Sequence, residues 1–395
     1  MKKNYLFCLS FLNLLIFLTA CNTQQEKTFT KEENLLRTTC DYLWKKQHVD
    51  GGWHSEHHGI LRGGQAYTPF ILHALLEVPD SIYQKPKEKV EKGLQFIRNN
   101  LSKNGVLGVK DPDVIEYPNY ATAYALRVLY KYGDKARDAA MIKKMQTYLV
   151  QQQFNEARGI VPKHLGYGGW GFGETNLPKG YTGHLDLSNT RRILQALSES
   201  QYKGEILYKN AQKFLHVVQR HPTDQRPQPN IDTTVKKKTF YDGGFYYSPT
   251  LPTANKAKQA PATEQYYAYF RSYATATCDG VLSLIAAGKP LNSEEVMAAK
   301  KWLLKYNSLD RPDGIPPDDN EQWDTVLIYY HLMVRAEAYF ALQHTSEWKM
   351  KMVDFLLKNQ QKNGSFSNPA GARNKEDDPY LASTCAVVIL MNVMK

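Results

Sequence analysis

Two kinds of helical segment alternate along the chain, and they differ in how their apolar residues are distributed. Segments such as 87–99 and 141–152 carry many lysines on one side and apolar residues on the other, which is typical of a surface helix. Segments such as 119–130 and 380–393 have small and apolar residues on most sides, which indicates a buried helix. The pattern predicts pairs of helices, with one member exposed and the other internal.

A fixed register marks the internal member of each pair: a hydroxyl residue is followed seven positions later by a leucine. A glycine turn precedes it, and an aromatic-aliphatic pair in the exposed helix precedes the turn. The six register pairs are Thr68/Leu75, Thr122/Leu129, Thr190/Leu197, Thr277/Leu284, Thr325/Leu332 and Ser383/Leu390. A unit that recurs every fifty residues or so indicates a repeat architecture. Six helical hairpins can close into a ring, with the internal helices as an inner ring and the lysine-bearing helices outside.

The first twenty residues predict an export signal. Lys2 and Lys3 provide a positive start, and an apolar run from Tyr5 to Leu18 is too short for an ordinary membrane span. The run ends in Leu-Thr-Ala-Cys21, which resembles a bacterial lipoprotein processing site. We therefore predict a signal peptide at 1–20, a tether at 21–30 and acyl chains such as palmitate on Cys21. A plain secretory signal that ends near a cysteine is the alternative. The lipid anchor would hold the protein at the cell envelope, at the outer membrane or facing the periplasm.

Residues 31–395 read as a single domain, because no low-complexity linker divides them. Two long segments, 154–185 and 221–266, are rich in Gly, Pro, Tyr and Asn, and loops of that length are usually functional. The formal net charge is +11, but the basic residues are scattered apart from Lys236–Lys238. Nucleic acid is therefore not expected as a partner. Anionic lipid or an acidic glycan makes better use of the charge.

The turn sequences resemble those of terpenoid cyclases. The segments 47–53 (QHVDGGW) and 360–366 (QQKNGSF) are similar to the Gln-to-Trp repeats of squalene-hopene cyclases, and related forms occur in protein prenyltransferase β subunits. The segments 168–172 (GGWGF), 185–190 (LDLSNT) and 271–280 (RSYATATCDG) extend the likeness. The resemblance covers essentially the whole mature chain as a repeat pattern. It implies an all-α (α/α)6 toroid of two concentric rings of six helices, one of the two rings found in triterpene cyclases.

The resemblance also shows which chemistry the chain lacks. Cyclases that start by protonation resemble one another in an Asp-x-Asp-Asp motif whose middle aspartate is the acid; here Ser188 stands in its place, and serine cannot protonate an alkene. Asp186 remains from the motif and also suits a helix N-cap. The prenyltransferase zinc ligands are missing at Asp324-Thr325-Val326 and Asp378-Pro379-Tyr380. Residues 318–322 (DDNEQ) do not complete a magnesium-diphosphate motif. We expect no cofactor.

Histidines cluster in the first turn, at His54, His57 and His58. Imidazole suits zinc, copper or nickel, but these histidines fall in a glycine turn and not on the face of a helix. An exposed polar loop is the simpler interpretation, so no metal site is predicted there.

The loop ends at the mouth of the ring are rich in Tyr, Trp, Asn and Arg, which suits an apolar or a glycan ligand. The catalytic candidates are Asp186, Asp324, His331 and Arg271. The ligand-binding candidates are Tyr67, Tyr120, Trp170, Asn189, Arg192, Tyr273, Trp323 and Tyr329. The alternative for these aromatic residues is packing within the turns. Two functions stay open: a binding protein for a lipid, isoprenoid or glycan, or an enzyme such as a cyclase-like isomerase or a polysaccharide lyase or hydrolase.

Overall fold

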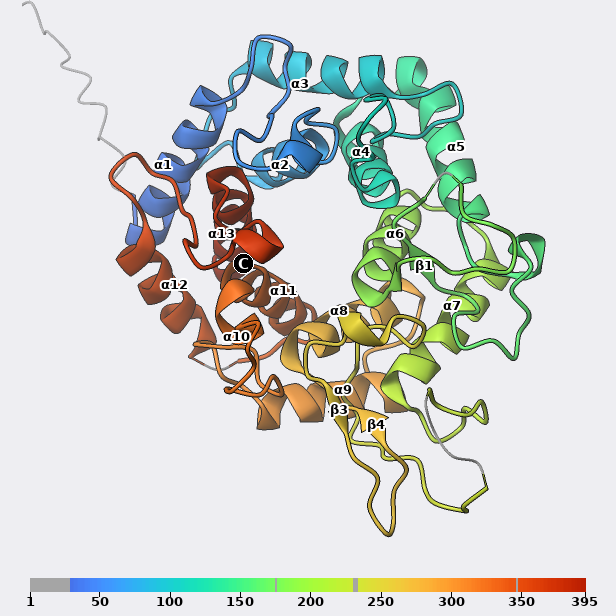
Figure 1. Cartoon of the computed structure of the whole chain (residues 1–395). Helices are drawn as coiled ribbons and strands as arrows, with labels where there is room; N and C mark the ends of the chain where they lie inside the picture. Colours follow the sequence, from blue (N-terminus) through green and yellow to red (C-terminus); the bar gives the residue numbers. More distant parts are fainter. Residues whose placement is uncertain (1–28, 175, 230–233, 346) are drawn as a thin grey trace, which may run out of the picture.

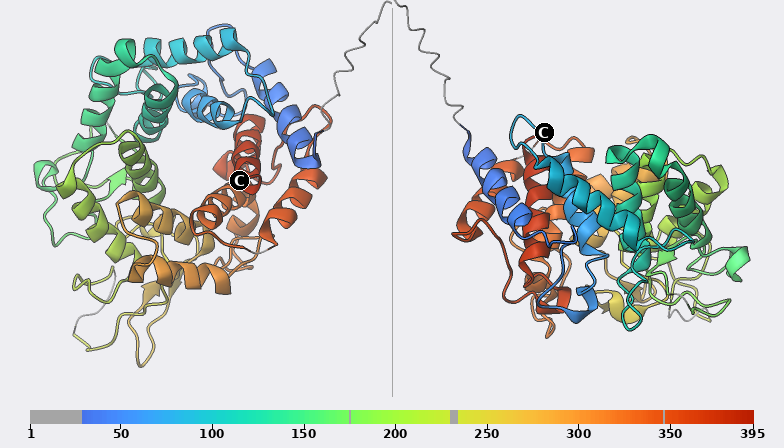
Figure 2. Two further views of the ribbon diagram at one scale, coloured as in Figure 1. Left: turned by 180° about the vertical axis from the view of Figure 1, so that it is seen from behind. Right: turned by 90° about the horizontal axis from the view of Figure 1, so that it is seen from above.

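The computed structural model describes residues 29–174, 176–229, 234–345 and 347–395, which form two concentric rings of helices (Figure 1). The inner ring contains α2 (Tyr67–Glu77), α4 (Pro118–Tyr132), α6 (Leu187–Glu199), α8 (Ala274–Ala286), α11 (Ile328–Ala341) and α13 (Pro379–Val393). The outer ring contains α1 (Lys31–Lys45), α3 (Lys87–Asn100), α5 (Lys135–Gln151), α7 (Glu205–Gln219), α9 (Glu294–Lys305) and α12 (Trp348–Asn359). The predicted all-α (α/α)6 toroid is confirmed, with segment 119–130 in the inner ring as expected. Figure 2 shows the same two rings from behind and from above.

The hydroxyl groups of the sequence register tie each inner helix to its glycine turn. The hydroxyl oxygen of Thr68 accepts the backbone N–H of Trp53 at 3.0 Å, and that of Thr122 accepts the N–H of Leu107 at 3.0 Å. The same bond, at 2.9–3.1 Å, recurs in the pairs Thr190–Trp170, Thr277–Phe245 and Ser383–Phe366. Each bond satisfies a buried backbone donor that no helix or sheet partner reaches. The register is therefore a packing signal for the turn.

Thr325 is an exception to the register. It lies exposed in the short helix α10 (Trp323–Val326), and its hydroxyl is 3.5 Å from Asp324 Oδ1. The chain leaves helical geometry at Leu327 before α11 begins, so Thr325 and Leu332 do not share one helix. The prediction that this pair marks an inner helix was therefore wrong for Thr325, although Leu332 is buried within α11.

Glutamines at the C-terminal ends of outer helices link neighbouring repeats. The amide of Gln47 donates to the carbonyls of Gly51 in its own turn and of Lys89 in α3, both at 2.9 Å. Gln153 and Gln219 repeat this arrangement toward α7 and α9. Gln360 closes the ring, because its amide donates to the carbonyl of Leu35 and the hydroxyl of Thr39 in α1. Gly364 in the same turn has φ +87°, and a Cβ there would lie 2.3 Å from the carbonyl oxygen of Thr38, so glycine is required at this seam.

Strands are minor in the described residues. Strand β1 (Trp170–Gly171) pairs antiparallel with β2 (Leu185–Asp186), and β3 (Gln259–Ala260) pairs with β4 (Tyr269–Phe270) at the base of a projecting hairpin (Figure 1). Short 3-10 turns occupy Gly59–Leu61, Glu156–Arg158, Pro252–Ala254 and Ala372–Asn374. Cys40, Cys278 and Cys385 are free and buried, and each packs as a small apolar side chain.

The predicted signal peptide, most of the tether and the lipidation residue Cys21 lie outside the described residues. Among the helices that are described, none has the length and apolar character needed to cross a bilayer.

Candidate functional site

A cavity of about 440 Å³ opens at the end of the ring where the inner helices begin. The first turns of α2, α4, α6 and α13 contribute to its wall, together with α10, α11 and the loops before the inner helices. Its aromatic lining residues are Tyr67, Phe70, Tyr117, Tyr120, Phe172, Tyr247, Trp323 and Tyr330. Because these rings come from repeats far apart in the sequence, ring closure is what brings them together. The volume is within the range that holds a small molecule or a short oligosaccharide.

The start of α6 places a compact polar network on the cavity wall. Asp186 is fully buried and caps the helix by accepting the backbone N–H of Asn189 at 2.8 Å, while the Asn189 amide donates to its second oxygen at 2.8 Å. The Ser188 hydroxyl donates to Asp186 at 2.9 Å and lies 2.8 Å from the hydroxyl of Tyr247. Ser188 and Asn189 line the cavity, and Asp186 lies behind them as their acceptor. The cap role expected for Asp186 is therefore confirmed.

Three cationic side chains line the same cavity. The ammonium group of Lys256 lies 4.4 Å from the ring centre of Tyr247 and 4.8 Å from that of Trp323. Arg373 approaches Trp323 at 5.7 Å, and Lys375 approaches Tyr117 at 5.6 Å. Arg373 is paired with Glu321 at 3.0 Å, whereas Lys256 and Lys375 form no ion pair with a described residue. Loss of solvent around its ammonium group lowers the pKa of Lys256 to about 8, against the opposing pull of Asp186, Asp279 and Glu321.

A buried layer of charge crosses the middle of the ring. Arg191 donates to Asp279 at 2.9 Å and pairs with Glu337 at 2.8 Å, and Arg192 pairs with Glu337 at 3.2 Å. The hydroxyl of Tyr330 donates to Asp279 at 3.0 Å, so this layer is coupled to the cavity wall. The two arginines hold the pKa of Glu337 down at about 2 even though burial opposes ionisation. Arg191 and Glu337 also line a second cavity of about 280 Å³, at the end where the inner helices terminate.

The structure brings together part of the residue set expected from sequence. Tyr67, Tyr120, Asn189 and Trp323 line the larger cavity. Asp186 lies behind its wall, and Arg192 belongs to the central charge layer.

The other expected residues lie elsewhere. Trp170 is buried, and its indole N–H donates to the carbonyl of Leu149. Tyr329 packs against Phe355 and Phe366.

His331 is buried against the carbonyl of Ser308, and burial lowers its pKa well below the ordinary value. Arg271 donates to the carbonyls of Ala257 and Gln259 beside a separate surface hollow. Tyr273 is buried as the N-cap of α8, and Asp324 is half-buried in α10.

Lys256, Tyr330, Lys375 and Glu337 are cavity or charge-layer residues that the sequence did not single out. Lys256 lies in the long loop 221–266, whose length and composition had indicated a functional segment. Nothing local distinguishes Tyr330 from Tyr329, or Lys375 from other surface lysines. Whether Tyr330 and Lys375 face the cavity depends on how their helix and loop are oriented in the closed ring.

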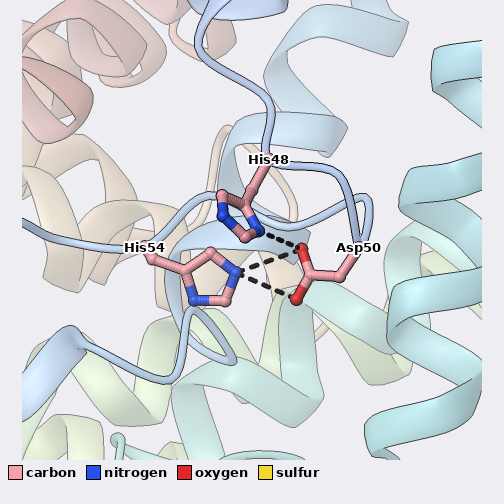
Figure 3. A group of neighbouring side chains, drawn as sticks. All are labelled: His48, Asp50 and His54. Carbon is pink, nitrogen blue, oxygen red and sulfur yellow. Dashed lines mark hydrogen bonds and ion pairs between the residues drawn. The ribbon is translucent and has the colours of Figure 1, made fainter.

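The predicted histidine cluster divides into separate environments. His58 pairs with Asp377 at 2.7 Å, and His57 is exposed. His54 turns the other way, toward Asp50 and His48 (Figure 3).

No protein-family model matches the sequence, and a search of the curated proteins also gives no match. Solved structures match nearly the whole chain. The type II terpene cyclase MstE from Scytonema, without ligand, is 14% identical, and the alignment covers 93% of this chain and 99% of that chain with a TM-score of 0.56. A variant of MstE in complex with its substrate, geranylgeranyl dihydroxybenzoate, is 12% identical over 92% of this chain and 97% of that chain, with a TM-score of 0.55.

An inactive variant of an α-1,6-mannanase from Salegentibacter, in complex with α-1,6-mannotriose, is similar too. It is 11% identical over 92% of this chain and 98% of that chain, with a TM-score of 0.51. One toroid fold thus serves a terpene cyclase and a glycan hydrolase. At these identities the likeness establishes the fold of this chain, and its function has to be argued from the site.

Proposed function

We propose that this toroid binds an acidic carbohydrate in the cavity where the inner helices begin. The observation that carries the proposal is the alternation of aromatic faces with cations around one cavity. Tyr117 and Trp323 offer ring faces on which a sugar can stack, and Lys256 and Lys375 offer positive charge for a carboxylate. The formal net charge is +11, or +9 without Lys2 and Lys3 of the predicted signal peptide, and it would attract such a ligand over longer distances.

Carbocation chemistry fits the cavity less well. Ser188 has a hydroxyl where the resemblance to cyclases places the acid, and its neighbour Asp186 is already occupied by three donors. A cationic intermediate would also be repelled by Lys256 at the cavity wall. We therefore expect squalene to be recovered unchanged after incubation with the protein. Formation of a cyclised product that is lost in Asp186→Asn would contradict this view.

Polar groups on the wall favour a carbohydrate over a lipid chain. Asn189 lines the cavity, and its amide donates to Asp186. Ser188 and Tyr247 add hydroxyl groups beside it. The hydroxyl of Ser188 already bonds to Tyr247 and to Asp186, and a sugar hydroxyl could join this network whereas an acyl or isoprenoid chain could not.

Binding can be tested by calorimetry with three probes: a uronic-acid oligosaccharide, its neutral counterpart, and vesicles that contain an anionic lipid. We expect binding of the acidic oligosaccharide only, weakened about tenfold or more in Lys256→Met, which corresponds to roughly 1.4 kcal/mol. Lys301→Met in the outer helix α9 is the control and should bind like the wild type. Equal affinity for the neutral sugar, or binding to vesicles alone, would refute the acidic-carbohydrate proposal.

A second candidate is a lyase that acts on the same ligand, because the pKa of Lys256 near 8 leaves part of its amine free to act as a base. The neutral amine would remove the proton next to the uronate carboxylate. The released electron pair would form a carbon-carbon double bond, and the glycosidic oxygen would leave once water or a hydroxyl protonates it. Ultraviolet absorbance of the unsaturated product tests this reaction. If the oligosaccharide binds and no such product forms, the protein is a binding protein.

We also propose that the toroid is held at the cell envelope by acyl chains on Cys21. The support is the Leu-Thr-Ala-Cys segment and the polar residues that follow it. Cys21→Ser should abolish acylation and move the protein into the soluble fraction, as measured by membrane fractionation and mass spectrometry. A variant that is still processed and retained in membranes would rule out the lipid anchor.

A further inference from the structure

Three potential ligand atoms meet in the first glycine turn, between α1 and α2 (Figure 3). His48 Nδ1 lies 3.3 Å from Asp50 Oδ1, and His54 Nε2 lies 3.1 Å from Asp50 Oδ2. All three atoms lie within 4.8 Å of one another. His48 and Asp50 are exposed and His54 is partly exposed, so an ion in solution can reach the group.

The same turn occurs elsewhere in the ring without this arrangement. Asp242 holds the position of Asp50 in the fourth turn, where Arg220 donates to it at 2.9 Å and Trp302 at 3.1 Å. In the sixth turn the position is the neutral Asn363. Both aspartates accept the backbone N–H two residues later, so that bond belongs to the turn itself. Among the turns that the structure describes, only the first faces its carboxylate with two imidazoles.

The hydrogen bonds of His54 decide which of its nitrogens can bind an ion. Its Nδ1 lies 2.9 Å from the carbonyl oxygen of Arg62. A carbonyl oxygen only accepts, so Nδ1 carries the proton, and in the neutral ring Nε2 presents a lone pair. That lone pair points at the Asp50 carboxylate, which also presents only lone pairs. Two acceptors at 3.1 Å repel each other unless a positive charge lies between them.

We propose that His48, Asp50 and His54 bind a divalent transition metal ion, with Zn²⁺ the best match. Two imidazole nitrogens and one carboxylate oxygen form a ligand set that zinc uses in three-ligand sites, with water as the fourth ligand. Ligand atoms at roughly 2.0–2.1 Å around a tetrahedral ion are separated by about 3.3 Å. The two histidine nitrogens lie 3.3 and 3.2 Å from Asp50 Oδ1, close to that separation. The Arg62 carbonyl acts as an outer partner that orients the His54 ring, a common feature of metal-bound histidine.

Binding of Zn²⁺ is measured by calorimetry and by elemental analysis after gel filtration, both for purified residues 29–395 and for the full chain. We expect one Zn²⁺ per chain and a rise in the thermal unfolding midpoint on adding the ion. His54→Ser and His48→Gln introduce the residues that the sixth turn carries at these positions, Ser367 and Gln361, which hydrogen-bond at 3.0 Å. Each variant should fold and bind Zn²⁺ at least about tenfold more weakly.

His57→Gln is the matched control, because His57 is exposed three residues from His54 and is not part of the group. This variant should bind like the wild type. Asp50→Asn keeps the turn acceptor and removes the charge, so it should lose the ion while circular dichroism stays unchanged. The proposal is overturned if the wild type binds no stoichiometric Zn²⁺, which leaves a protonated His54 paired with Asp50. It is also overturned if His57→Gln weakens binding as much as His54→Ser.

Discussion

The ammonium group of Lys256 is poorly solvated, because it lies at the wall of the cavity. Its ammonium group lies among Tyr247 and Trp323 at the cavity wall, without an ion pair to a described residue. Desolvation lowers its pKa from 10.5 to about 8, and distant carboxylates compensate only in part. The Lys256 amine can therefore bind an anionic ligand in its charged form, or act as a base in its neutral form.

The pKa of Lys256 sets a pH dependence for stability. Because the pKa of Lys256 is lower in the folded protein, the lysine of the unfolded chain binds more protons between about pH 8 and 10.5, and the contribution of Lys256 to stability becomes more favourable as pH rises through that window. Lys256→Met should therefore raise the free energy of unfolding below pH 8, and this gain should shrink toward pH 10.5. Urea unfolding across this range measures it.

Lys256→Arg is the control for this prediction, because arginine stays charged throughout. Its stability relative to the wild type should fall as the pH increases from 8 to 10.5. If the difference between Lys256→Met and the wild type does not change with pH, the ammonium group is solvated and the pKa argument fails.

At the scale of the helical elements, five of the six repeats share a hydrogen bond between a hydroxyl group of the inner helix and a backbone N–H of the preceding turn. Thr122 illustrates it: its hydroxyl is buried in α4 and accepts the N–H of Leu107, which is also buried. Valine has the same shape and would fill the same volume, but it cannot accept a hydrogen bond. The backbone N–H of Leu107 would then be buried without a hydrogen-bond acceptor, which destabilises the turn.

Thr122→Val should lower the free energy of unfolding by about 1–3 kcal/mol, the cost of one buried donor left unsatisfied. Thr122→Ser keeps the acceptor and should cost only about 0.8 kcal/mol for the lost methyl group. Urea unfolding measures both losses. The slope of the free energy of unfolding against urea concentration should be the same for the two variants and the wild type. Equal losses in the two variants would show that packing, and not the hydrogen bond, fixes the turn.

At the scale of the whole molecule, four charged groups from three inner helices close the centre of the ring. Arg191 and Arg192 from α6 meet Asp279 from α8 and Glu337 from α11, and they separate the two cavities. The charges balance, so the layer is tolerable as a set even though both arginines are fully buried. Removal of one member leaves a buried charge without compensation.

Glu337→Gln should lower the free energy of unfolding by about 3–5 kcal/mol, because it leaves two buried arginines with Asp279 as their only carboxylate. Glu88→Gln, which removes an exposed carboxylate paired with Lys92, should change it by less than about 1 kcal/mol. Thermal and urea unfolding distinguish these outcomes. A loss in Glu337→Gln as small as that in Glu88→Gln would mean that water solvates the layer.

The candidate site was predictable in part, and adjacent residues show the limit. Tyr329 and Tyr330 have the same side chain, yet Tyr329 packs between α11 and the outer ring while Tyr330 lines the cavity. One residue step turns a helix by about 100°, so the rotation of α11 against its neighbours decides which tyrosine faces inward. The histidine group has the same origin. The sequence singled out His54, His57 and His58, but the turn brings His54 to His48 and Asp50 instead.

The sequence by itself determined the ring, because its signals are local: helix periodicity, glycine turns and hydroxyl groups each act within a single repeat. It also showed which acid and which zinc ligands of similar toroids are missing. Only the tertiary structure decided the cavity lining, the position of Lys256, the four-charge layer and the break that removes Thr325 from the register. Each of these depends on contacts between residues tens to hundreds of positions apart, which exist only once ring closure has fixed the rotation of every helix.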